Sequence, residues 1–241
     1  MKKYGFTLSE VLITLGIIGI VAAVTMPSLI QNKNDKETVN RLKKVYSSLS
    51  QAYLMLSAEY GDPTNWGIIF ANGGTPDIPT EEGTKSSVNL ANLFAKHMNI
   101  IKNCGAEEGC FSPDSSVYKR RDVGKILLND GTALGFAGLN GECTKNRGNT
   151  KHLSAVCAWI IVDTNGSRRP NQYGVDIFEF SLTKYGIIPY GTPEDTAFPF
   201  ETSCFQHNNS NNGCTAWVLY NENLDYRKCS DLGWKTKTKC K

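Results

Sequence analysis

The first 30 residues contain an apolar segment that constrains how the rest of the chain can be placed. Residues 11–30 carry no charged side chain, and Lys2 and Lys3 precede them closely. About 20 apolar residues in a helix cross a hydrocarbon layer roughly 30 Å thick. Because lysines beside a span tend to stay in the cytoplasm, we expect residues 6–30 to form a transmembrane helix with its N-terminus inside. Residues 31–241 would then form a domain outside the cytoplasm.

One acidic residue, Glu10, lies at the start of this apolar segment. A charged carboxylate inside a membrane span costs about 3 kcal/mol unless it is paired or neutral. A conventional signal peptide, cleaved near Ala22-Ala23, is the alternative interpretation of the segment. That alternative leaves the acid unexplained, so we favour an N-terminal segment with a function of its own.

The residues around the acid, GFTLSE at 5–10, resemble the processing site of type IV prepilins and type II secretion pseudopilins. The resemblance implies that residues 1–5 are a leader peptide and that a prepilin peptidase cleaves between Gly5 and Phe6. It further implies that Phe6 is N-methylated and that Glu10 is needed for filament assembly. The implied fold is a long N-terminal helix packed on an antiparallel sheet.

The Glu10 carboxylate and the amine that cleavage would free on Phe6 give a physical reason for this arrangement. Cleavage after Gly5 would free a cationic α-amino group on Phe6, and an ammonium and a carboxylate in lipid compensate each other when they lie together. We expect the Phe6 amine of a neighbouring subunit to pair with Glu10. The alternative is that Glu10 only reaches to the membrane interface.

The resemblance also implies partners and a location. They are copies of this chain and related pilins in a helical filament, the prepilin peptidase, and an inner-membrane assembly platform with a cytoplasmic ATPase. The chain would be a single-pass protein of the bacterial inner membrane before it enters an extracytoplasmic filament. Pilus, secretion pseudopilus and competence filament share this N-terminus. Two alternatives stay open: a membrane-tethered adhesin or DNA or wall-polymer binder that does not polymerise, and a secreted enzyme with a cleaved conventional signal.

Eight cysteines all follow the membrane segment, and an even number in this position indicates disulfides formed in an oxidising compartment. Eight cysteines allow 105 pairings. We favour pairing in sequence order, with zinc as the weaker alternative because no Cys-x-x-Cys pair occurs. The favoured pairs are Cys104 with Cys110, Cys143 with Cys157, Cys204 with Cys214, and Cys229 with Cys240.

A second apolar pattern predicts that the N-terminal helix continues to Tyr60. Apolar residues spaced 3-4-3-4 form one stripe, suited to covering a sheet face or to a coiled coil. Gly61-Asp62-Pro63 is expected to end the helix. The stripe consists of Val39, Leu42, Tyr46, Leu49, Tyr53, Leu56 and Tyr60.

The rest of the chain predicts an α+β fold with a disulfide-rich C-terminal region. We expect a short helix over residues 88–102, followed by an antiparallel sheet of about four strands. Asp130-Gly131 is a strong hairpin signal between two of them. The expected strands are residues 125–129, 132–139, 155–162 and 174–182, with a short piece at 187–189.

Asp163, Asn165 and Asp176 offer oxygen atoms of the kind that calcium prefers. They lie in one loop, but their spacing matches neither an EF-hand nor the calcium loop of pseudopilins. We favour a hairpin connection whose acids cap turns, and keep calcium as the alternative. No other cofactor is expected.

The formal charge of +3 falls to +1 when Lys2 and Lys3 are lost with the leader, so nucleic-acid binding is not expected. Basic clusters at 119–121, 168–169 and 235–241 are ordinary surface composition. No catalytic residue is assigned, because the three histidines are scattered and no nucleophile or phosphate-binding motif occurs.

Overall fold

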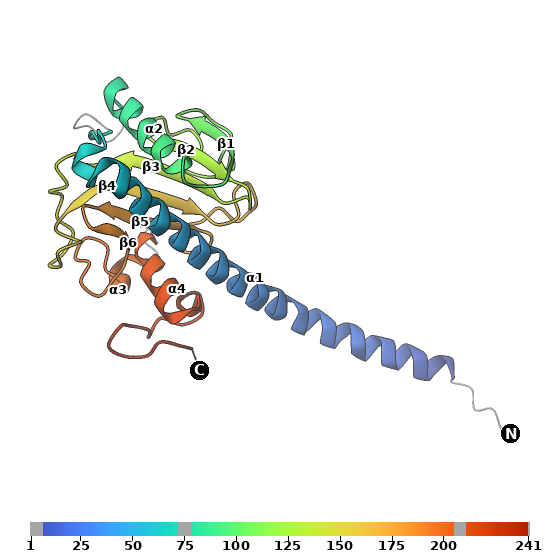
Figure 1. Cartoon of the computed structure of the whole chain (residues 1–241). Coiled ribbons are helices and arrows are strands. Elements are labelled where there is room, and N and C mark those ends of the chain that lie inside the picture. The colour runs from blue at the N-terminus through green and yellow to red at the C-terminus, as the bar shows by residue number, and fades with distance from the viewer. Residues whose placement is uncertain (1–6, 72–78, 205–210, 241) are drawn as a thin grey trace. The chain divides into compact units, whose positions relative to one another are not determined.

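The computed structural model describes residues 7–71, 79–204 and 211–240. It divides into two compact units, residues 1–37 and 38–241. Along the described chain, a long helix and a second helix precede a sheet, and short helices follow it (Figure 1).

Helix α1 runs from Leu8 to Tyr60 and belongs to both units. Within the 38–241 unit one side of it is buried, which confirms the predicted helix and its stripe, although Tyr60 is 39% exposed. The helix ends at Gly61, which has a φ of +77° and donates its N–H to the Ser57 carbonyl. A 3₁₀ turn, Pro63–Asn65, follows. The buried side consists of Val39, Leu42, Val45, Leu49, Ala52, Tyr53 and Leu56.

The described strands form one antiparallel sheet in which each strand pairs with the next in sequence. The predicted hairpin at Asp130-Gly131 is present, and Leu128 donates its N–H to the Thr132 carbonyl across it. The sheet has six described strands, whereas the sequence predicted about four. They are β1 (Ile100–Gly105), β2 (Gly124–Leu128), β3 (Ala133–Gly138), β4 (Val156–Asp163), β5 (Ile177–Thr183) and β6 (Gly186–Pro189).

Helix α2 spans Glu81–Ala95 rather than the expected 88–102. The Thr80 side chain caps its N-terminus by accepting the Gly83 N–H. Residues 100–105, expected partly as helix, instead form the edge strand β1. Ile100 and Ile101 are β-branched, and pairing with β2 outweighs their helical spacing.

One face of the sheet packs against α1 and α2 and forms the main core. Figure 1 shows both helices crossing this face within the 38–241 unit. Alternate strand residues point into the core, as a half-buried strand requires. These include Ile126, Phe136, Ile160 and Phe180, with the Tyr46 ring stacked on Phe180 at 5.6 Å.

The opposite face of the sheet carries a buried polar network. Glu179 of β5 is 3% exposed and accepts a hydrogen bond from Asn212 Nδ2 at 2.9 Å. Burial raises the pKa of Glu179 to about 7, and the charge of Arg147 opposes that rise. The Arg147 guanidinium donates to Asp195 at 3.0 Å and lies over the Tyr190 ring at 3.4 Å. The network joins the sheet to the segment that follows β6.

The C-terminal region consists of short helices around an aromatic cluster. The sequence analysis predicted neither these helices nor the cluster. Phe200 and Trp217 stack with ring centroids 4.0 Å apart, and Trp234 packs against both. The helices are α3 (Phe200–Ser203), α4 (Thr215–Asn221) and the 3₁₀ turns Asn212–Cys214 and Asp225–Arg227.

All eight cysteines are joined in disulfides, and the pairing follows sequence order as favoured above. Each disulfide closes a short loop of its own rather than connecting distant parts of the chain. The pairs are Cys104–Cys110, Cys143–Cys157, Cys204–Cys214 and Cys229–Cys240.

Candidate processing and assembly site

Thr7 and Glu10 form a capping box at the start of α1. The Thr7 backbone N–H and hydroxyl both donate to Glu10 Oε2, at 2.8 and 2.7 Å. In return, the Glu10 N–H donates to Thr7 Oγ1 at 3.3 Å. The two residues therefore satisfy hydrogen-bonding groups of the first helical turn that would otherwise lack partners.

This capping box gives Glu10 partners within its own helix, which the sequence analysis missed. The signal was present as Thr-x-x-Glu before an apolar run. Gly5 and Phe6, the residues of the expected cleavage and methylation, lie outside the described residues. Thr7 follows the expected cut, so its bonds to Glu10 would survive processing.

The apolar residues after Glu10 are exposed along α1. Leu12, Ile18 and Leu29 are each more than 60% exposed. Among the described residues, α1 is the one helix long and apolar enough to cross a membrane, with a mean hydropathy of 2.2 in its most apolar window. A Cβ atom added at Gly16 or Gly19 would meet no heavy atom within 4 Å, so another helix could approach closely there.

The loop between β4 and β5 brings together the three residues considered for calcium. Asp163 Oδ1 accepts the backbone N–H groups of Asn165 and Gly166, at 3.1 and 2.8 Å. Asp176 accepts the Asn165 side-chain amide at 2.9 Å and the backbone N–H groups of Asn171 and Gln172. The acids thus act as turn-forming acceptors, the arrangement that the hairpin interpretation requires.

Burial changes the pKa of one acid in this loop, Asp163. Asp163 is fully buried. That burial, followed by the nearby charge of Asp176, raises the pKa of Asp163 to about 8. A cation would relieve the repulsion between the two acids, but their oxygens already accept hydrogen bonds from the loop backbone. The described residues contain no group of three or more His, Cys, Asp or Glu side chains able to hold a metal ion.

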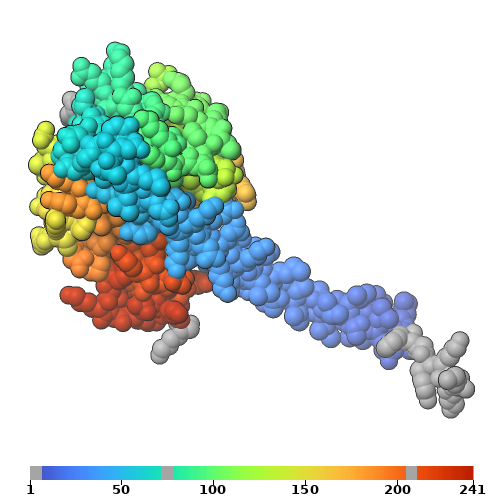
Figure 2. Space-filling model, viewed as in Figure 1, coloured from blue at the N-terminus to red at the C-terminus, as the bar shows by residue number. Residues whose placement is uncertain are grey.

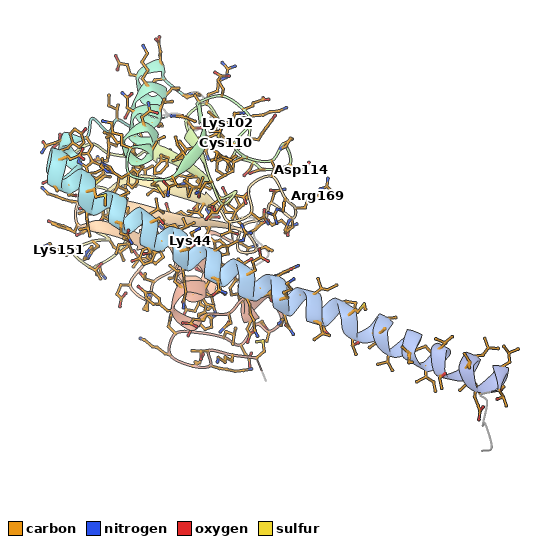
Figure 3. All side chains as sticks on the ribbon, turned by 45° about the vertical axis from the view of Figure 1, so that its right-hand side comes forward. Lys44, Lys102, Cys110, Asp114, Lys151 and Arg169 are labelled. Atoms are coloured by element: carbon orange, nitrogen blue, oxygen red, sulfur yellow. A yellow bond between two sulfur atoms is a disulfide. The ribbon has the colours of Figure 1, made fainter. Side chains whose placement is uncertain are left out.

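Each of the three basic clusters contains a residue that pairs with an acid of the same chain. Arg120 donates to both Asp122 carboxylate oxygens and lies over the Trp159 ring. Arg169 pairs with Asp114, and Figure 3 shows these two side chains next to each other. In the C-terminal segment, Lys237 pairs with Asp231. Pairing of this kind weakens the local positive potential that a nucleic-acid site needs.

Two of the three histidines lie in the described residues, and each contacts a different side chain. His97 follows α2, with Nε2 3.2 Å from Glu59 Oε1 at the end of α1. His152 packs edge-on against Tyr185. His207 lies outside the described residues.

The chain combines a prepilin-type N-terminal signal with a long helix packed on an antiparallel sheet. Residues 1–26 match the prokaryotic N-terminal methylation motif, which is the prepilin-type cleavage and methylation signal. The apolar helix and this motif are compatible with membrane anchoring.

The globular part of the chain shows which family it belongs to. Residues 28–224 match a family of unknown function, DUF6613, and the chain belongs to that family. No curated protein and no solved structure matches the chain.

Proposed function

We propose that this chain is the precursor of a structural subunit, a pilin or pseudopilin, of a type IV pilus or type II secretion-type filament. Prepilin peptidase cleaves it between Gly5 and Phe6, Phe6 is N-methylated, and residues 6–30 anchor the subunit until it is extracted from the inner membrane. The match of residues 1–26 to the methylation motif is the observation that carries this proposal.

Assembly then exchanges the lipid around α1 for other subunits. Lipid and protein contacts are similarly apolar, so packing and the Glu10 carboxylate must supply the specificity. The Phe6 amine of a neighbouring subunit is the proposed partner of Glu10. Extraction requires an assembly platform driven by a cytoplasmic ATPase. The proposal gives the chain a structural role and assigns it no catalytic residue.

A second candidate function is a membrane-tethered binding protein outside the cytoplasm that does not polymerise. The capping box favours it, because Glu10 already has hydrogen-bond partners in its own helix and does not require another subunit. Pairing of Arg120 and Arg169 with acids argues against an anionic polymer as the bound partner.

N-terminal sequencing and intact mass of the protein from its host test the processing steps. We expect a first residue of Phe6 carrying one methyl group, whereas retention of residues 1–5 would contradict the proposal. Separating sheared filaments from membranes tests assembly. Glu10→Ala should leave the membrane-bound subunit present and abolish its recovery in filaments, with Glu10→Asp as the conservative control. Unchanged filament recovery in Glu10→Ala would favour the tethered protein.

A further inference from the structure

A surface hollow of about 260 Å³ lies where three segments of the 38–241 unit meet. One wall is a side of α1, the second is the connection between α2 and β1, and the third is the turn between β2 and β3. Figure 2 shows α1, in blue to cyan, against the green surface of the segments that follow it. The residues that line the hollow include Lys44, Met55, His97, Met98 and Asp130.

Two methionine side chains from distant parts of the sequence line this hollow. The chain has four methionines, and Met1 and Met26 precede the 38–241 unit, so both methionines of that unit lie here. Met98 packs at the edge of the main core, but Met55 is 50% exposed, so core packing does not account for its thioether. A thioether is a soft, polarisable ligand that selects monovalent copper, whereas harder cations prefer oxygen.

His97 adds an imidazole to the lining, and a carboxylate lies beside one of its ring nitrogens. His97 Nε2 is buried, and Glu59 Oε1 lies 3.2 Å from it. A carboxylate in this position favours the proton on Nε2, which leaves the lone pair on Nδ1. Histidine ligands of metal ions are commonly oriented by a carboxylate at their other nitrogen. The lining of the hollow thus supplies one imidazole and two thioethers.

The charges around the hollow suit a monovalent cation. Lys44 pairs with Asp130 at 2.7 Å, so the lysine of the lining is neutralised by an acid, and Figure 3 marks Lys44 on α1. Glu59 adds a negative charge beside His97. All eight cysteines are joined in disulfides, so no free thiolate competes for a soft ion. Within the described residues, no three His, Cys, Asp or Glu side chains gather as a zinc site would need.

We propose that this hollow binds a soft monovalent metal ion, Cu(I), through the sulfurs of Met55 and Met98 and the imidazole of His97. Glu59 is a positioning residue that holds the imidazole. Met55 belongs to α1 and the other two ligands follow α2, so a bound ion would join these two elements of the 38–241 unit. The site is independent of the filament function, because it lies within one subunit and needs no second copy.

Silver(I) tests the proposal, because it is a soft monovalent ion like Cu(I) and stays in one oxidation state. The full-length protein, with its disulfides intact, is purified in mild detergent and titrated with silver nitrate in chloride-free buffer by calorimetry. We expect one ion per chain. The isotope-labelled methyl signals of Met55 and Met98 should shift in NMR spectra, and that of Met26 should not. Absence of binding, or shifts confined to other methionines, would overturn the proposal.

Substitutions separate metal binding from packing. Met55→Leu and Met98→Leu keep the side-chain volume and remove the sulfur, so each should retain the melting temperature and lower the affinity for silver(I) at least roughly tenfold. Met26→Leu is the matched control for a thioether outside the hollow and should leave the affinity unchanged. Glu59→Gln should weaken binding less than either ligand variant. Because Met55 is exposed, its variant folds even where the Met98 variant does not.

Zinc distinguishes soft ligands from oxygen ligands in the same titration. Zinc nitrate should neither bind at comparable concentration nor displace silver(I), because thioethers are poor ligands for a cation that prefers sulfur as thiolate. Unchanged silver(I) affinity in both leucine variants of the hollow would overturn the site. Displacement of silver(I) by zinc would overturn the assignment of the ion. None of these measurements uses filament recovery, so failure here leaves the filament function untouched.

Discussion

The buried acid Asp163 should make the protein less stable as the pH rises from acid to neutral. Its folded-state pKa is about 8, and its ordinary value is 3.8. The folded protein therefore keeps this proton to a higher pH than the unfolded chain does. The stabilisation is fully present below about pH 4 and is lost between about pH 4 and about pH 8.

The size of this pH dependence follows from the difference in bound protons between the folded and unfolded protein. One proton released on unfolding changes the free energy of unfolding by about 1.4 kcal/mol per pH unit. Between about pH 5 and about pH 7 the wild-type protein should lose about 3 kcal/mol from Asp163. Asp163→Asn keeps an oxygen for the Asn165 and Gly166 N–H groups and carries no charge. The variant should therefore lack this contribution, and its stability relative to wild type should rise by about 3 kcal/mol over the same range.

Urea unfolding of the full-length protein in mild detergent, followed by tryptophan fluorescence, measures this difference. The wild type and the variant share every other titrating group, so the subtraction leaves the contribution of Asp163 together with its coupling to Asp176. Asp231→Asn, which removes a surface carboxylate, is the control for loss of a charge without burial. A difference between wild type and Asp163→Asn that stays constant across the pH range would refute the reasoning.

Three further predictions use the same protein. Glu179→Gln should also remove pH dependence, but only between about pH 4 and about pH 7, because the folded-state pKa of Glu179 is about 7; unchanged pH dependence in the urea assay would contradict the assignment. Thr7→Ala should speed amide hydrogen exchange in the first turn of α1, since losing a helix cap costs about 1 kcal/mol, whereas Thr7→Ser should retain protection. Adding millimolar calcium should leave the melting temperature unchanged, because the Asp163 and Asp176 oxygens already accept hydrogen bonds; a rise reversed by chelator would establish a calcium site instead.

The long helix and the central hairpin were predictable because local signals and tertiary packing agree. The stripe from Val39 to Leu56 has one period and meets one sheet face, and Asp130-Gly131 has the backbone that a tight turn needs. The Thr7–Glu10 capping box has an equally local signal, because Thr-x-x-Glu before an apolar run is enough to predict it.

Strand β1 and the C-terminal helices were not predictable from local pattern. Ile100 and Ile101 fit a helical face, and only the partner strand β2 makes them extended. Helix α4 is seven residues long, too short to form without packing, and Trp217 holds it against Phe200 from a distant segment. The polar network of Glu179, Asn212 and Arg147 joins residues far apart in the sequence, so spacing gives no sign of it.

The ordered pairing of strands and cysteines bears on how the chain folds as it emerges. Each strand finds its partner in the strand before it, and each disulfide joins the next two cysteines to emerge. A chain whose residues after the apolar helix emerge from a translocation channel in sequence order can therefore form its strand pairs and disulfides progressively, before its C-terminal end appears. Thiols that would mispair are consumed soon after they arrive, which lowers the demand for an isomerase.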